Sequence, residues 1–276
     1  MNNIIDFHIH AGDFPQLRED IQDLIQKIPL EDGADVKKLF SNGEAMSAYL
    51  QNAGVSTGII LAECGPGTNY SITSEMIANR CKDNNSLVPF GSVNPNYHKD
   101  PIAEFHKSIE AGVRGFKFYP ADHGFDALSS DMMEIYKLCE QHGVVIMFHT
   151  GFTAQKDTEQ MYCNPADFIP IFEACPELAV VLCHAGKPHW YKESVEVITK
   201  YPNAFIDTAL VPIDVVTELV RSNPKVVDKV LFGSDWPVCG NYEALVERYL
   251  HSGLSEVQLQ KIMRTNALSL LTRRDF

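Results

Sequence analysis

Short apolar segments alternate with longer segments of helical periodicity along the whole chain. The apolar segments have the length and residue types of strands and predict eight of them: Ile4–His10, Thr57–Ala62, Leu87–Val93, Gly115–Tyr119, Val144–His149, Ala179–His184, Ala204–Asp207 and Val230–Asp235. Helical periodicity lies between them, for example over Pro101–Ala111, Ser130–His142, Pro165–Ala174, Ser194–Tyr201 and Ile213–Ser222. This alternation is typical of βα units around a parallel sheet, and eight units predict an α/β fold of the (β/α)8 barrel type. No linker or change in composition divides the chain, so we expect a single domain over residues 1–276.

One connection is much longer than the others. About 35 residues (11–45) follow the first strand before the helix predicted around Ala45–Ala53, whereas such loops usually have roughly two to six. Within this insertion, apolar residues recur at helical spacing: Leu17, Ile21, Leu24, Ile25 and Ile28. We therefore expect a short helix over the face of the barrel where the strands end. The pattern leaves two interpretations open, packing against the barrel rim and a mobile lid.

Composition narrows the classes of protein. The 276 residues include 36 acidic and 23 basic side chains, a formal charge of −13, which opposes binding to nucleic acid. The longest apolar runs are strand-sized and much shorter than a membrane span of about 18 residues, so we expect no membrane association. The first residues lack the basic and apolar regions of a secretory signal. The seven cysteines form no Cys-x-x-Cys pair, which favours reduced thiols in a cytoplasmic protein.

The first predicted strand carries two histidines at alternating positions. Side chains alternate along a strand, so Asp6, His8 and His10 are predicted to share one face. The other face is apolar, with Ile5, Phe7 and Ile9. We expect the apolar face to pack under the helices and the imidazoles to point into the barrel, where two of them can bind one metal ion. Such a pair is a weak signal alone.

Three other strands end in the same way. An apolar run ends on one ionisable side chain and a small or turn residue follows, at His149, His184 and Asp235. Polar groups at the carboxyl ends of barrel strands are where active sites are built. A single buried histidine is usually structural, but four strands ending on the same face favour a common site.

Together these motifs resemble the amidohydrolase superfamily. The resemblance rests on Asp6-x-His8-x-His10, on single histidines ending the fifth and sixth strands, and on Gly233-Ser234-Asp235-Trp236-Pro237. The last motif and the compact length are most similar to its amidohydrolase-related branch, which includes aminocarboxymuconate-semialdehyde decarboxylase, resorcylate decarboxylase and several hydrolases. The terminal Arg264-Thr265-Asn266-Ala267, followed by Leu270-Leu271, is also similar to this branch.

The resemblance implies a ligand set and roles for its neighbours. It implies that His8, His10, His149 and Asp235 hold one divalent metal ion, most often zinc. His184 would then be the acid/base or carbonyl-polarising residue. Neutral imidazoles, a carboxylate and an exchangeable water suit Zn²⁺ or Mn²⁺. Asp235 can in addition take a proton from that water, and Asp6 is better placed to support the ligands than to bind the metal.

Two lysines are candidate substrate-binding residues. On the fourth strand Phe116 and Phe118 share one face, so Lys117 is predicted to point into the barrel. The resemblance offers two roles for such a cation, a carboxylated lysine that bridges two metals or a residue that binds a substrate carboxylate. A structural ion pair with Asp6 is the third interpretation. Lys187 lies three residues after His184 and is the second candidate.

Other polar residues follow the strand ends. Asp122, His123, His189 and Trp190 either contact substrate or are solvated loop residues.

The motifs fit more than one reaction. We predict hydrolysis of a small, carboxylated lactone, amide or ester by metal-activated water. The alternative is a non-oxidative decarboxylase, a carbon–carbon lyase with the same ligands. A nuclease of the TatD type fits less well, because that group has Glu on the fourth strand and Thr-Asp on the eighth. The sequence leaves the substrate, the metal and a homo-oligomeric state open.

Overall fold

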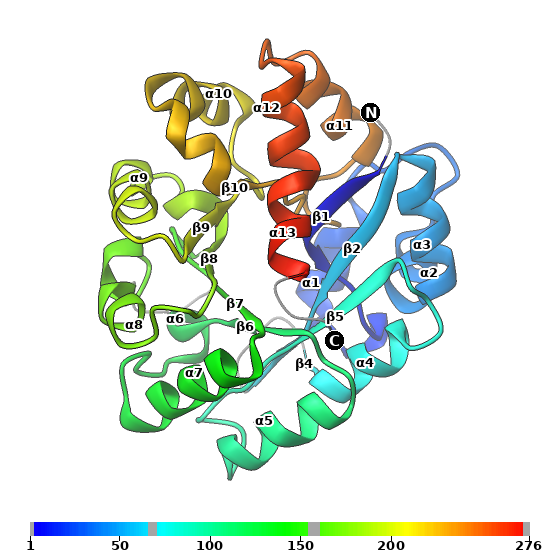
Figure 1. Cartoon of the computed structure of the whole chain (residues 1–276). Helices are drawn as coiled ribbons and strands as arrows, with labels where there is room; N and C mark the ends of the chain where they lie inside the picture. Colours follow the sequence, from blue (N-terminus) through cyan, green and yellow to red (C-terminus); the bar gives the residue numbers. More distant parts are fainter. Residues whose placement is uncertain (1–2, 66–70, 154–160, 273–276) are drawn as a thin grey trace.

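Eight parallel strands surround a common axis in the computed structural model of the chain (Figure 1). The structure describes residues 3–65, 71–153 and 161–272; the predicted domain over 1–276 also includes segments outside these ranges. The strands neighbour one another in the order of the chain: β1 (Ile4–His10), β2 (Val55–Leu61), β5 (Leu87–Gly91), β6 (Gly115–Phe118), β7 (Val145–Phe148), β8 (Val180–Leu182), β9 (Ala204–Asp207) and β10 (Val230–Leu231). The predicted (β/α)8 barrel is confirmed.

Backbone hydrogen bonds close the barrel between its last and first strands. The Phe7 amide donates to the Phe232 carbonyl at 2.8 Å, and the Asp235 amide donates to the His8 carbonyl at 2.8 Å. The His10 amide then donates to the Trp236 carbonyl, also at 2.8 Å. The segment after β10 therefore lies alongside the histidines of β1.

Helices follow the strands, as the periodicity predicts. The longer ones are α3 (Gly43–Asn52), α4 (Ser74–Cys81), α5 (Pro101–Glu110), α7 (Ser130–His142), α9 (Tyr191–Lys200), α10 (Ile213–Ser222) and α11 (Tyr242–Leu250). Shorter segments are α6 (Pro120–His123), η2 (Pro165–Phe168), α8 (Ile169–Ala174), η4 (Pro224–Lys229), α12 (Glu256–Gln260), η5 (Lys261–Thr265) and α13 (Asn266–Leu271). Local signals set their ends: the Asp100 side chain accepts from the Ala103 amide at the start of α5, and Gly143 ends α7 with a φ of 68°.

The long insertion after β1 contains the predicted helix. It folds as η1 (Phe14–Gln16), α1 (Glu19–Gln26) and α2 (Val36–Ser41). Phe14, Leu17, Ile25 and Phe40 from this segment are buried in the same apolar cluster as the barrel's outer face. The structure thus shows the insertion packed on the rim.

The strands separate two apolar layers. Their outward side chains pack against the helices. Their inward side chains form a second cluster, the barrel interior, which contains Ile5, Phe7, Ile59, Leu61, Phe90, Val145, Met147, Ala179, Val181, Cys183, Phe205 and Leu231. Ala267 and Leu270 of α13 join this cluster, and α13 crosses the barrel axis in Figure 1. The interior is therefore apolar at the end that α13 covers, and the polar strand ends lie opposite.

Strand β1 departs from the predicted alternation. Ile5 and Phe7 belong to the barrel interior, whereas Ile9 belongs to the outer cluster, so the predicted common outer face was wrong. The pairing of β1 with β2 shifts register between Asp6 and Ile9, and such an irregularity changes which face the next side chain takes. Asp6 is hydrogen bonded to Tyr242 of α11, which corrects the prediction that it shares the face of His8 and His10.

Two further features concern the whole chain. All seven cysteines are free. Among the described residues, no helix combines the length and apolar character needed to cross a bilayer.

Candidate metal centre

Three predicted ligands converge where β1 and β10 end. The ligand atoms of His8, His10 and Asp235 lie within 4.8 Å of one another, and all three residues are buried. His10 Nε2 lies 3.0 Å from Asp235 Oδ1, and His8 Nε2 lies 3.4 Å from the same oxygen. The close pairing of the segment after β10 with β1 explains why residues 225 or more positions apart meet here.

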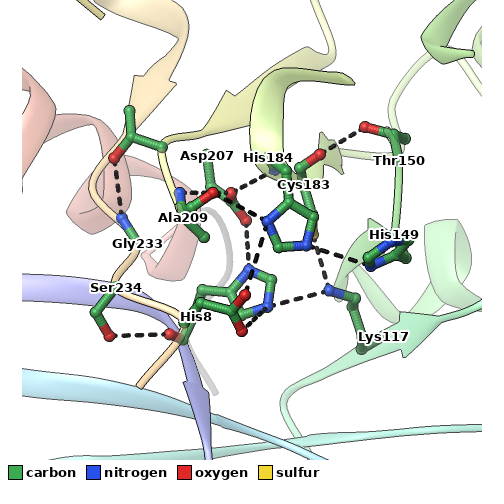
Figure 2. Close-up of polar contacts among 12 residues, drawn as sticks. His8, Lys117, His149, Thr150, Cys183, His184, Asp207, Ala209, Gly233 and Ser234 are labelled. Atoms are coloured by element: carbon green, nitrogen blue, oxygen red, sulfur yellow. Dashed lines mark hydrogen bonds and ion pairs between the residues drawn. The ribbon is translucent and has the colours of Figure 1, made fainter. Parts of the chain in front are cut away.

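Asp207 orients His8, a role that the sequence did not reveal. His8 Nδ1 lies 2.8 Å from Asp207 Oδ2 (Figure 2), so Nδ1 carries the proton and Nε2 keeps its lone pair. The other carboxylate oxygen accepts from the His184 amide at 2.7 Å and the Ala209 amide at 3.1 Å. A carboxylate behind a histidine is the usual support of a metal ligand.

His149 and His184 form a second histidine pair beside the first. His184 Nδ1 lies 3.0 Å from the Ala209 carbonyl oxygen, which can only accept, so this nitrogen carries the proton. His184 Nε2 then accepts from His149 Nδ1 at 3.2 Å (Figure 2). His149 Nε2 is left with a lone pair; it is buried and has no hydrogen-bond partner among the described residues.

The residues present fit a divalent cation. Burial lowers the pKa of His8, His149 and His184, which keeps their imidazoles neutral and able to bind a metal. Burial opposes ionisation of Asp235, yet its pKa is held well below the usual range, and the hydrogen bond with the His10 imidazole contributes to this. Neutral imidazoles, one carboxylate and an unpaired buried nitrogen are a suitable donor set for Zn²⁺ or Mn²⁺. His149 lies outside the close trio, so its place as fourth ligand stays a prediction.

The site is built on strained backbone. His184 and Asp235 have φ values of 61° and 62°, a left-handed conformation that non-glycine residues rarely adopt. Such residues cost about 1–3 kcal/mol each and persist where the surroundings hold them. His184 and Ala185, with φ of 48°, also explain why β8 ends at Leu182, earlier than predicted.

Lys117 points into the barrel, as predicted. Its side chain is fully buried, and Nζ lies 3.3 Å from His8 Nε2 and 3.1 Å from Cys183 Sγ (Figure 2). Its Nζ also lies 4.9 Å from the centre of the Tyr119 ring. Asp6 is the ion-pair partner that the third interpretation of Lys117 requires. It accepts hydrogen bonds from the His8 amide, the Ser234 amide and the Tyr242 hydroxyl instead.

Lys187 approaches the same centre from the loop after β8. Burial lowers its pKa, and the carboxylates of Asp235 and Asp207 counter that effect. Its amide donates to the His184 carbonyl at 2.9 Å, and its carbonyl accepts from the Phe152 amide at 2.8 Å. Lys117 thus lies beside the imidazole of His8, and Lys187 interacts electrostatically with Asp235.

Among the loop residues, His123 is buried, Asp122 and Trp190 are half-buried, and His189 is exposed. Asp122 accepts from the Thr153 hydroxyl, and the His123 ring lies 5.1 Å from the Tyr119 ring. Burial lowers the pKa of His123 to about 4. The first two residues thus belong to the wall of the site rather than to a solvated loop.

Comparison with known proteins agrees with this geometry, which defines a metal-binding (β/α)8 barrel. A family model described as Amidohydrolase matches residues 5–273. The chain therefore belongs to the amidohydrolase family, as the motifs predicted, and is a metal-dependent enzyme of that superfamily. No curated protein matches the sequence significantly.

Solved structures share the fold at low sequence identity. An uncharacterised TIM-barrel protein from Bordetella bronchiseptica has a TM-score of 0.81 and 21% identity, over 98% of this chain and 99% of that one. A dihydroxybenzoic acid decarboxylase from a Polaromonas species, with bound manganese, has a TM-score of 0.70 and 14% identity, over 100% and 98%. A probable 2-pyrone-4,6-dicarboxylic acid hydrolase from Acinetobacter baumannii, with citric acid bound, has a TM-score of 0.67 and 14% identity, over 98% and 99%.

Proposed function

We propose that this protein is a metal-dependent hydrolase that adds water to a small carboxylated lactone, ester or amide. The observation that carries the proposal is the carboxylate of Asp235. Its Oδ1 faces the Nε2 atoms of His8 and His10, and its pKa is held low, so it is ionised and able to bind a divalent ion. A divalent ion bound here supplies Lewis acidity and lowers the pKa of water.

The proposal gives each residue of the site a role in metal binding or proton transfer. His8, His10, Asp235 and the predicted ligand His149 would hold the metal, with Asp207 fixing the tautomer of His8. Asp235 accepts the proton of the attacking water. His184 is the predicted acid/base or carbonyl-polarising residue; both its ring nitrogens have partners, so this role requires the contact with His149 to open when substrate binds.

Two lysines, one buried and one half-buried, support a carboxylated substrate. A protein of charge −13 repels anions at long range, so cations beside the metal-binding residues favour local selection of a negative group. Lys117 and Lys187 are the groups that would bind it. The citric acid in the Acinetobacter structure is also a carboxylated small molecule, in a protein with the same fold.

One observation favours the alternative function, a decarboxylase. The Polaromonas decarboxylase shares the fold over almost the whole of both chains, and its name gives a hydroxylated aromatic acid as its substrate class. The two lysines, beside the residues that would hold the metal, would then bind the carboxylate that is lost. Zinc is our proposed metal, with manganese, as in that decarboxylase, as the alternative.

The deciding experiment follows the oxygen of water. The metal-loaded enzyme is given carboxylated lactones, esters, amides and hydroxybenzoates in ¹⁸O-labelled water. We expect the label in the product carboxylate, and activity on neutral esters much lower than on acids. Lys117→Met should abolish this preference, while Lys192→Met, at a position on the exposed face of α9, should leave it unchanged. Release of carbon dioxide without incorporation of label would assign the lyase instead.

A further inference from the structure

A cavity lies between the barrel and the helices α10 and α11. Its volume is about 400 Å³, and its lining comes from these two helices and from the segments that follow β9 and β10. Six apolar side chains contribute to its wall: Leu210, Val211, Pro212, Ile213, Val238 and Leu245. A cavity of about 150 Å³ is large enough for benzene, so this one has room for a substituted ring.

The cavity lies on the outer side of the strands, behind the metal centre. Ile206 of β9 and Phe232 after β10 belong to the outer apolar cluster. Thr208 and Ser234 stand two residues further along and therefore keep to the outer side, where both line the cavity. Asp207, between Ile206 and Thr208, reaches His8 instead. The cavity and the metal centre are thus separate spaces on the two sides of the same segments.

One buried hydroxyl group of the cavity has no hydrogen-bond partner. Tyr249 lines the cavity and is 2% exposed, and its hydroxyl has no partner among the described residues. The Thr208 hydroxyl acts on it electrostatically and accepts from the Gly233 amide at 3.3 Å. The Ser234 hydroxyl already has two backbone partners. Because an unpaired buried polar group costs free energy, Tyr249 favours a molecule that brings a hydrogen-bond acceptor.

The exposed part of the lining is apolar and balanced in charge. Leu210 and Val238 are 36% and 40% exposed. Leu210 also has a φ of 53°, a left-handed conformation that costs free energy in a residue other than glycine. Asp214 and Arg248 are exposed there with opposite charges. Such an entrance favours a neutral, largely apolar molecule over an ion.

We propose that this cavity binds a neutral aromatic molecule with one hydrogen-bond acceptor, such as an aromatic ketone, and that this molecule is an effector of the metal centre. The ring contacts the apolar wall, and the acceptor receives the hydrogen bond of Tyr249. This site uses none of the residues proposed for the reaction, so it is expected in a hydrolase and in a decarboxylase alike.

Two contacts connect the cavity with His8. The Ser234 hydroxyl donates to the His8 carbonyl at 3.2 Å. Thr208 directly follows Asp207, whose carboxylate holds the His8 ring. A molecule that displaces either hydroxyl in the cavity therefore changes how His8 is held. Because such coupling is reciprocal, the molecule changes the affinity for the metal by the same factor as the metal changes the affinity for the molecule.

A pair of probes tests the binding site. Acetophenone and ethylbenzene are similar in shape, but only the ketone has an acceptor. In calorimetric titrations of the metal-loaded protein, we expect acetophenone to bind about tenfold more tightly than ethylbenzene. Tyr249→Phe should remove this preference and keep the affinity for ethylbenzene. Tyr97→Phe, at an exposed tyrosine, is the matched control and should keep the preference.

A variant that fills the cavity gives a second test of its location. Leu245→Trp should abolish binding of both probes, whereas Leu24→Trp, at an exposed position of α1, should leave both affinities unchanged. Absence of acetophenone binding in wild type, equal affinities of wild type for the two probes, or an unchanged preference in Tyr249→Phe would overturn the site.

The effector role has its own readout. Competition with a fluorescent chelator, with and without saturating acetophenone, gives the metal affinity. We expect a change of about fivefold or more in wild type and none in Leu245→Trp. Equal metal affinities in wild type would overturn the effector role. Neither measurement needs turnover, so a failure here is distinct from a failure of the proposed function.

Discussion

The two ends of the barrel interior differ in polarity, although the same strands form both. At the end covered by α13, the inward side chains are apolar, as in Ile5, Val145 and Leu231. At the other end, the same strands carry His8, Lys117 and Asp207, all fully buried. Burying ionisable groups costs free energy unless they are paired, whereas burying apolar ones is favourable. The apolar end therefore stabilises the fold, whereas the polar end positions ionisable groups for chemistry at a cost in stability.

The largest expected effect is at the polar end, where His8→Ala and Asp235→Ala each remove a member of the close trio. We expect metal content to drop from near one equivalent per chain to a small fraction of that value. His106→Ala, an exposed histidine of α5, should retain the metal. Inductively coupled plasma mass spectrometry of the purified variants measures this. Full retention of metal by either trio variant would remove that residue from the ligand set.

A second prediction separates the two histidine pairs. His184→Asn should keep most of the metal and lose about 10²-fold or more in turnover, since His184 is predicted to act on substrate and not to bind the ion. Metal content and kcat are measured on the same preparation. Loss of metal as complete as in His149→Ala would show that His184 is a metal ligand and would contradict this prediction.

The third prediction concerns the support behind His8. Asp207→Asn keeps the shape of the side chain but weakens the hydrogen bond to Nδ1, so metal affinity should fall about 10–100-fold. Competition with a fluorescent chelator gives the affinity. An unchanged affinity would show that the barrel wall alone orients the ring.

A fourth prediction addresses the apolar end. Leu231→Ala removes a fully buried side chain of the barrel interior and should lower the free energy of unfolding by about 2–5 kcal/mol. Urea unfolding measures the loss, and metal bound per folded chain should stay at the wild-type value. If Leu231→Ala keeps wild-type stability but loses its metal, this residue supports metal binding and not the fold, which contradicts the prediction.

Sequence periodicity predicted the barrel because inward and outward side chains alternate so regularly along most strands. It failed on β1, where the pairing with β2 shifts register between Asp6 and Ile9, so that Ile9 lies on the outer face whereas Ile5 and Phe7 lie inside. Asp6 meets Tyr242 instead of sharing the face of His8 and His10. Such a shift depends on pairing with distant strands and leaves no local pattern.

The site was predictable only in part for a related reason. Alternation along the first strand predicts His8 and His10 as ligands, the end of an apolar run predicts Asp235, and the structure brings the three together. Asp207 carries a similar signal, an acidic residue at an inward position where a strand ends. Its importance emerges only from a three-dimensional contact, the one with His8.

Metal stoichiometry of wild-type protein, purified without added metal, tests the central claim of a single metal centre most directly. Elemental analysis by mass spectrometry, combined with the intact mass of the chain, counts the ions and detects carboxylation of Lys117. The account predicts one equivalent of zinc or manganese per chain and an unmodified Lys117. Two equivalents together with a carboxylated Lys117 would contradict it and replace the single centre by a bridged pair.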